Sequence, residues 1–237
     1  MASKYGPEYF AARRMSAANE EHVPRTMAKL KRVVKLGPAM RVLEVGCGLG
    51  GLSRALAGEV AHVTAIDLSN HAIEEARAAT AAKNITFESA DALAFRPAGK
   101  FDLALALSVF EHFGRGEQQK FLRTARRWLA PGGRLVLHVP IAESWSGRRR
   151  KSRRASDHGV EGMDYTGDPT HKATFSLKTF RKALADGGFR IAKEWVRYSR
   201  WGWPAGWARV AMSALPARVR ETFAMEAVAA VEPAVEK

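Results

Sequence analysis

A short apolar run that ends in a glycine-rich turn constrains the fold of this chain more than any other feature. Residues 40–45 are mostly apolar, which is typical of a short buried strand, and Gly46, Gly48 and Gly51 follow before the next helical segment. Glycine lets the backbone approach a ligand where a Cβ atom would collide, and amides at the start of the following helix can face a negative group. The turn alone is a weak signal, because dinucleotide sites share it and a tight strand-to-helix turn needs no ligand.

Strands and helices are predicted to alternate downstream of this turn. The apolar periodicity predicts helices over 51–57, 70–82 and 117–129 and strands over 60–66, 85–89, 101–108 and 134–139. Such alternation implies parallel βαβ units with right-handed crossovers, so we expect an α/β fold with a Rossmann-like, doubly wound, mostly parallel sheet. Ser69 and Ser176 are placed to cap the helices that follow them, and a further strand is expected over 189–196.

Polar residues follow successive predicted strands. Asp67 ends the second strand, where a carboxylate can accept hydrogen bonds from both hydroxyls of a ribose. Asp91 and Ala92 follow the third strand, and there an acid can accept from an exocyclic amine while the small alanine leaves room for a ring. Ser108 to His112 follow the fourth strand. Because carboxyl ends of parallel strands share one edge, we expect all these residues to line one crevice.

These motifs, in this order, resemble those of the class I S-adenosylmethionine-dependent methyltransferase family, specifically its small-molecule branch. The turn over 44–50 is similar to the first motif of that family, Asp67 to its ribose-binding acid, and residues 91–92 to its adenine site. The segments 107–113 and 129–135 are similar to its fourth-strand motif and to its approach to the fifth strand. The resemblance covers residues 40–140 well and 171–189 more loosely.

The resemblance implies S-adenosyl-L-methionine as the cofactor. It also implies that the cofactor is bound by residues of the loops after the first four strands, namely Glu44, Gly46, Cys47, Gly48, Gly50, Asp67, Leu68, Asp91, Ala92, Ser108 and Val109. One departure concerns the chain's end. The last strand of the family usually closes the chain, whereas the tail from Thr222 to Lys237 is rich in alanine and glutamate and is interpreted here as helix or disorder.

A single methyltransferase domain over 1–237 is expected, because 237 residues with 46% hydrophobic content can bury one sizeable core. It has four predicted parts: an N-terminal helical cap over 1–37, a cofactor-binding core over 38–140, a basic excursion on the substrate side over 141–170, and the C-terminal part of the sheet and cap over 171–237. A single cysteine is typical of a reducing compartment, and no apolar run approaches the ~20 residues of a membrane span. We therefore expect a cytoplasmic protein that is soluble or at most peripheral to a membrane.

The fourth-strand loop disfavours two kinds of nucleobase methylation. Enzymes that methylate adenine or cytosine amines resemble one another in an Asn/Asp-Pro-Pro-aromatic segment, whereas residues 108–111 here read Ser-Val-Phe-Glu. Attack at pyrimidine C5 ordinarily needs a cysteine nucleophile, and Cys47 lies inside the glycine turn.

Three residues are candidates for catalysis. His112 is the first candidate for a general base, because imidazole titrates near neutral pH and the residue borders the predicted crevice. His171 is the second, and Glu111 lies beside His112 in the sequence. Either histidine could instead pack or hydrogen-bond locally. Glu111 and His112 also resemble the metal-binding pair of some quinone-ring methyltransferases, but those carry a further acid at the position of Ser108, so we predict no metal.

The sequence allows two interpretations of the methyl acceptor, which come from different classes of molecule. Four tryptophans, Trp195, Trp201, Trp203 and Trp207, alternate with arginines, which suits a small-molecule or lipid-like acceptor or peripheral contact with an anionic membrane, although they could simply pack the cap. The basic run over 148–154 favours instead an RNA methyltransferase, the second hypothesis. A cofactor-binding module without catalysis is a third and is disfavoured by the intact motifs. The distribution of the +14 net charge matters more than its sum, because a diffuse excess only aids solubility whereas clusters create fields.

Overall fold

A seven-stranded, mostly parallel sheet organises the molecule. The computed structural model describes residues 5–12, 21–141, 170–198, 215–216 and 224–234, and the strand order across its sheet is β3-β2-β1-β4-β5-β7-β6. The strands are β1 (Arg41–Val45), β2 (His62–Asp67), β3 (Ile85–Ser89), β4 (Phe101–Leu107), β5 (Leu129–Pro140), β6 (Phe189–Tyr198) and β7 (Ala224–Pro233). The first five pair in parallel, while β7 runs antiparallel between β5 and β6. The predicted Rossmann-like, doubly wound fold is confirmed.

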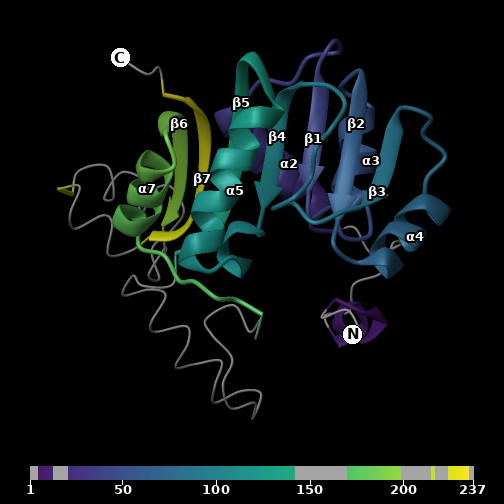
Figure 1. Ribbon diagram of the computed structural model, residues 1–237, viewed down its shortest axis with the longest axis horizontal. Coiled ribbons are helices and arrows are strands. Elements are labelled where there is room, and N and C mark those ends of the chain that lie inside the picture. The colour runs from purple at the N-terminus through teal and green to yellow at the C-terminus, as the bar shows by residue number, and fades with distance from the viewer. Residues whose placement is uncertain (1–4, 13–20, 142–169, 199–214, 217–223, 235–237) are drawn as a thin grey trace.

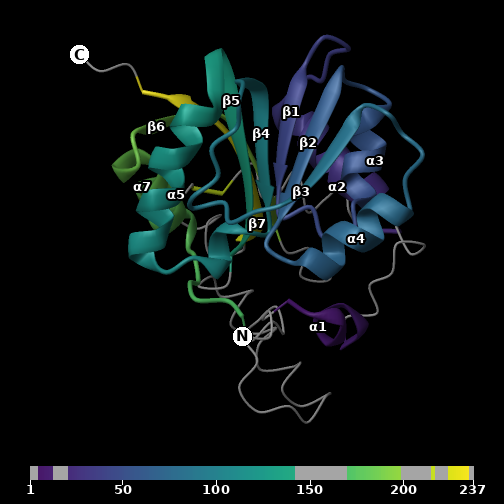
Figure 2. The ribbon, with the colours of Figure 1, turned by 45° about the vertical axis from the view of Figure 1, so that its right-hand side comes forward.

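Helices cover both faces of this sheet. They are α1 (Pro7–Ala12), α2 (Val23–Val33), α3 (Gly51–Ala57), α4 (Asn70–Ala78), the short 3-10 helix η1 (Phe110–His112), α5 (Arg115–Trp128) and α7 (Leu177–Asp186). In Figure 1, α5 and α7 lie in front of the sheet, and α2 and α3 lie behind it. Helix α1 stands apart from both layers, below the carboxyl ends of the strands (Figure 2).

The central strands β1 and β4 are buried on both faces, which explains their nearly continuous apolar sequences. Side chains alternate between faces along a strand, so Leu103 and Leu105 of β4 pack into the core under α2 and α3, whereas Ala104 and Ala106 pack into the core under α5 and α7. All four are fully buried. A sheet covered in this way leaves its carboxyl edge as the place where polar loops gather.

Local signals fixed several helix starts as predicted. The Ser69 hydroxyl accepts from the Ala72 amide at 3.2 Å, and the Ser176 hydroxyl accepts from the Thr179 amide at 3.0 Å, so both residues cap their helices. Helix α5 begins at Arg115, two residues before the predicted start. The Glu117 carboxylate accepts from the Gly114 amide at 2.8 Å and thereby satisfies a free N–H at that end.

The chain's tail is where the prediction was wrong. Residues 224–233 form strand β7, not helix or disorder, and pair with both β5 and β6. Alanine favours helix in isolation, but a strand inserted between two others gains backbone hydrogen bonds on both edges and buries both faces. Ala227, Ala229 and Ala230 are each fully buried there. Small side chains let the helices on either face approach this part of the sheet closely.

None of the helices within the described residues has the length and apolar character needed to cross a membrane.

Candidate active site

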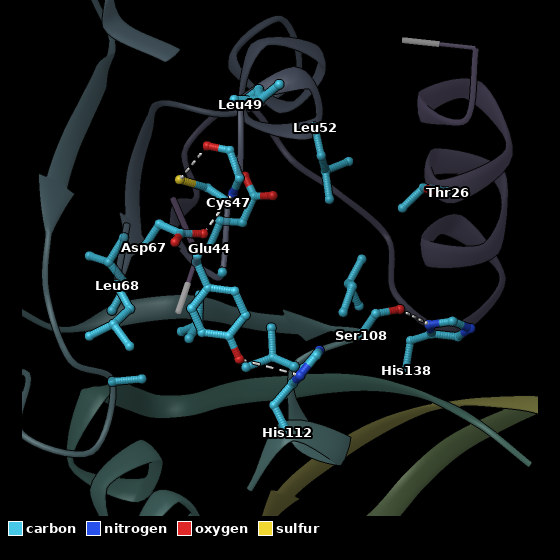
Figure 3. A pocket seen from close by; sticks show the side chains of 18 of the residues that line it. Thr26, Glu44, Cys47, Leu49, Leu52, Asp67, Leu68, Ser108, His112 and His138 are labelled. Atoms are coloured by element: carbon cyan, nitrogen blue, oxygen red, sulfur yellow. Dashed lines mark hydrogen bonds between the residues drawn. The ribbon is translucent and has the colours of Figure 1, made fainter. Parts of the chain in front are cut away.

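A cavity of about 900 Å³ opens at the carboxyl edge of the sheet. All of the predicted site residues except Gly50 and Glu111 line it, as do residues from α1 and α2. Figure 3 shows its two ends, with Asp67 and Leu68 on one side and Ser108 and His138 on the other. The expectation that the loops after the first four strands share one crevice is therefore confirmed.

The glycine turn lies against the loop after β4. Gly46, Gly48 and Gly50 all have positive φ, a region that side chains disfavour. A Cβ atom at Gly46 would lie 2.5 Å from Val109 Cγ2, and one at Gly50 would lie 2.9 Å from the side chains of Ala76 and Phe87. Gly50 is thus needed for packing behind the turn rather than at the cavity wall. The lack of a side chain at Gly46 lets the turn pack directly against the loop that carries Val109, and both line the cavity.

Asp67 is held rigidly at the end of β2. Its two carboxylate oxygens accept from the Gly48 and Ser69 amides, each at 2.9 Å. Burial raises the pKa of Asp67, and these backbone hydrogen bonds oppose the increase. Each oxygen retains a lone pair for a second donor, so the carboxylate can still accept from a pair of ligand hydroxyls.

The neighbouring residues suit a flat apolar ring. Leu68 lines the cavity and is 57% exposed. Among the described residues, no other large hydrophobic side chain is exposed. Ala92 is buried in the loop after β3. In the same loop, one carboxylate oxygen of Asp91 accepts from the Leu93 amide at 2.8 Å. A ring placed beside Leu68 would cover its apolar surface and bring polar ring atoms within reach of Asp91.

Burial disfavours the charged form of two groups in the turn. Burial raises the pKa of Glu44 to about 7, and the hydrogen bond from Ser53 partly opposes this. Burial also raises the pKa of the Cys47 thiol, with the carboxylates of Glu44 and Asp67 adding to the effect. A thiol held protonated is a poor nucleophile, in agreement with the expectation that Cys47 does not attack a substrate.

His112 and His171 lie together on the cavity wall. The Nδ1 atom of His112 lies 2.8 Å from the Thr170 hydroxyl and 3.4 Å from the Tyr5 hydroxyl, and the two imidazole rings meet edge to face with centroids 4.7 Å apart. The Glu111 carboxyl is 1% exposed and does not line the cavity. Ligand atoms of Glu111, His112 and His171 lie within 4.8 Å of one another, so these three could supply a metal ion with ligands. The absence of a metal stays a prediction.

Sequence reasoning missed a second cluster of polar side chains. The Ser108 hydroxyl lies 3.0 Å from His138 Nδ1, and His138 Nε2 lies 2.9 Å from a carboxylate oxygen of Glu226 (the first contact is drawn in Figure 3). Lys29 of α2 donates to the same carboxylate at 2.7 Å, and Arg197 of β6 also donates to it. His138 could have been noticed, because it lies near the end of a predicted strand. Glu226 could not, because its segment was not recognised as a strand.

Basic residues of α2 lie in three different surroundings. Lys31 does pair with exposed Glu59, at 2.6 Å, as an ordinary surface ion pair. Arg25 lines the cavity, however, and Arg32 lies over the ring of Trp195 at 5.1 Å from its centroid. Trp195 therefore packs against α2. The other three tryptophans of the cluster and the basic run over 148–154 lie outside the described residues.

Comparison with known proteins agrees with this arrangement. The sequence model of a family described as a methyltransferase domain matches residues 14–194. A ubiquinone biosynthesis O-methyltransferase from Xanthomonas axonopodis pv. citri is 36% identical over 153 residues, which are 62% of this chain and 59% of that protein. One from Caulobacter sp. is 35% identical over 102 residues, 41% of this chain and 40% of that protein. The chain thus matches roughly half the length of these curated relatives.

Among solved structures, the magnesium protoporphyrin IX methyltransferase of Synechocystis PCC 6803, solved with bound SAH, superposes with a TM-score of 0.60. The superposition covers 90% of this chain and 82% of that one at 20% sequence identity. At that identity the likeness supports the fold alone.

Proposed function

This chain belongs to the methyltransferase domain family, and on that premise we propose that it transfers a methyl group from S-adenosyl-L-methionine to a hydroxyl oxygen of a small or lipid-like acceptor. The observation that carries the proposal is the two-ended cavity. One end has the shape and acceptors for a nucleoside, and the other gathers imidazole and hydroxyl groups around open space. Relatives named as O-methyltransferases support oxygen as the acceptor atom.

The nucleoside end fits the adenosine part of the cofactor. Asp67 would accept from the ribose hydroxyls, Asp91 from the adenine amine, and Leu68 with Ala92 would border the ring. The positive φ of Gly46 and the contact that a Cβ atom would make there show that this turn has no room for a side chain. When bound, the cofactor supplies an electrophilic methyl group on a positively charged sulfur.

Glu44 would face the positively charged part of the cofactor. It lines the cavity, and its pKa of about 7 reflects burial, which outweighs the opposing effects of the Ser53 hydrogen bond and the Arg54 charge. A nearby positive charge would favour the ionised form, so binding would release a proton from this carboxyl.

The acceptor end provides alignment and apolar surface. Ordinary ligand cavities span about 300–1,000 Å³, so a cavity of about 900 Å³ has room for a small acceptor beside the cofactor. Tyr5, whose hydroxyl lies near His112, offers aromatic surface there to a ring or an apolar chain, whereas Tyr9 and Phe10 line the cavity nearer the glycine turn, where Phe10 packs with Leu49 and Ala72. His112 and His171 are proposed to contact the acceptor. Holding the acceptor oxygen in line with the methyl group then supplies much of the rate.

A labelled-methyl assay tests the proposal. The purified chain would be incubated with cofactor carrying a labelled methyl group and with phenols and catechols, each with and without an isoprenoid tail. We expect label in an ether product. Bulk RNA serves as a parallel acceptor, because the RNA hypothesis depends on the run over 148–154. Label in RNA alone would replace the proposal with that hypothesis, and cofactor binding without transfer to any acceptor would support a binding module.

A further inference from the structure

A carboxylate, an imidazole and a hydroxyl form a continuous hydrogen-bonded chain that ends in the cavity. We propose that Glu226, His138 and Ser108 form a proton relay, in which the proton of the acceptor hydroxyl passes through Ser108 to His138 while Glu226 positions and stabilises the charged ring. The proposal rests on the proposed function, since only a hydroxyl acceptor has this proton to lose.

The fold brings the three residues together from distant parts of the sequence. Ser108 directly follows β4, His138 lies near the end of the adjacent strand β5, and Glu226 lies on β7, the strand on the other side of β5. In the β5 and β7 register His138 pairs with Val228, and Glu226, two residues away from Val228, points to the same face. The carboxylate therefore reaches the ring diagonally across the two strands.

The charged groups around Glu226 keep it ionised. Burial acts to raise its pKa, but hydrogen bonds with His138 and Lys29 outweigh burial and hold the pKa of Glu226 well below its ordinary value. Lys29 reaches it from α2 and Arg197 from β6, so cations approach from both neighbouring elements. The carboxylate itself is 6% exposed. An ionised carboxylate in this position can only accept hydrogen bonds.

That restriction determines which nitrogen of His138 carries the proton. A neutral imidazole has one N–H, and the contact with the Glu226 carboxylate requires it on Nε2. Nδ1 then has a free lone pair and accepts from the Ser108 hydroxyl. The ring is thus in the form in which its basic nitrogen faces the cavity, as a proton acceptor needs.

Ser108 has an unusual backbone. Among the non-glycine residues that the structure describes, Ser108 is the one with a positive φ, which is 58°. A non-glycine residue in this region is strained by roughly 1–3 kcal/mol and persists where the surroundings enforce it, often at functional sites. The Ser108 amide donates to the His138 carbonyl at 3.1 Å, so backbone and side-chain contacts join the same two residues. This geometry holds the hydroxyl at the end of β4 between the ring and the cavity.

The relay balances the chemistry of methyl transfer. The acceptor oxygen forms a bond to the methyl carbon, and the carbon–sulfur bond breaks with its electron pair left on sulfur. The acceptor's proton moves to Ser108 Oγ as the proton of Ser108 moves to His138 Nδ1. The positive charge lost at sulfur is therefore regained on His138, where Glu226 stabilises it.

Ring-nitrogen NMR tests, without any turnover, the tautomer of His138 that the relay needs. In the wild-type protein at mildly alkaline pH we expect His138 Nε2 protonated and Nδ1 unprotonated. In Glu226→Gln the side-chain amide can donate to Nε2, so the proton moves at least in part to Nδ1. A wild-type ring that carries its proton on Nδ1 would overturn the relay.

The kinetic test uses His138→Gln and Ser108→Gly, because glycine removes the hydroxyl and suits the positive φ. Both should lower kcat, and for His138→Gln the fall should be about 10²–10⁴-fold with the KM for cofactor nearly unchanged. Glu226→Gln should also lower kcat, because no carboxylate then stabilises the protonated ring.

His62→Gln is the matched control. His62 Nε2 also meets a hydroxyl, that of Thr86 at 3.1 Å, but on the surface at the opposite end of the sheet. It should keep the wild-type rate. An active wild-type protein whose His138→Gln variant keeps its rate overturns the relay alone, whereas a wild-type protein that methylates no hydroxyl acceptor overturns the proposed function and the relay with it.

Discussion

The two ends of the cavity are built in different ways. The residues of the nucleoside end lie at the ends of β1, β2 and β3 or in the loops that follow them. These three strands are neighbours both in the sequence and in the sheet. The acceptor end draws on α2, η1, β5, β7 and residues 170–172, which are far apart in the sequence. A local pattern is enough to predict the first end. The second depends on which strands and helices become neighbours only in the folded protein.

If the two ends are also separate in function, substitutions should divide them cleanly. Changes at the acceptor end should lower turnover and leave cofactor affinity intact. Changes at the nucleoside end should lower cofactor affinity and leave turnover intact.

The largest effect is expected for His112→Ala at the acceptor end. Removing a side chain that contacts the acceptor should lower turnover by about 10²–10⁴-fold, while calorimetry should find cofactor affinity nearly unchanged. His62→Ala is a control for loss of a surface histidine. A variant with full turnover would leave His112 as a packing residue held by Thr170 and Tyr5.

The next effect is expected for Asp67→Ala at the nucleoside end. Two hydrogen bonds to a charged acceptor contribute about 1.5–3 kcal/mol each, so the cofactor should bind on the order of a hundredfold or more weakly. Asp102→Ala is the matched control, because Asp102 also accepts a backbone N–H, from Arg41 at 2.8 Å, but away from the cavity. Unchanged affinity in Asp67→Ala, measured by calorimetry, would refute the ribose assignment.

A smaller effect, on stability, is expected for Glu44→Gln. The pKa of Glu44 in the folded protein is about 7, above the ordinary value of 4.5, so the folded state binds this proton more tightly than the unfolded chain does. Wild-type stability should therefore fall as pH rises from 4.5 through about 7, by at most about 3 kcal/mol. The glutamine variant should lose this dependence in urea unfolding, and Glu88→Gln, at an exposed position on β3, should keep it.

The smallest effect is expected from metal removal. We predict no metal, so a chelator should leave turnover unchanged. Loss of turnover that a divalent cation restores would identify Glu111, His112 and His171 as ligands and would change the role of His112 from contacting the acceptor to binding an ion.

The contrast between the ends also explains how far the sequence could be interpreted. The bounds of α3 and β3, the caps at Ser69 and Ser176, and the position of Asp67 at the end of β2 all follow from local patterns and were predicted correctly. Strand β7 was missed because alanine favours helix, and its pairing depends on β5 and β6, which lie far away in the sequence. Glu226 was missed with it. No local pattern shows that a glutamate in an alanine-rich tail will contact a histidine 88 positions earlier in the sequence.

Strand β7 also orders the events of synthesis. The loops of the nucleoside end are complete once β4 has been made, whereas β7 inserts between β5 and β6 after both have left the ribosome. A nascent chain can therefore assemble its cofactor-binding loops before Glu226 exists. Because the relay gains its carboxylate only with this strand, the proton acceptor is incomplete until β7 has paired with β5.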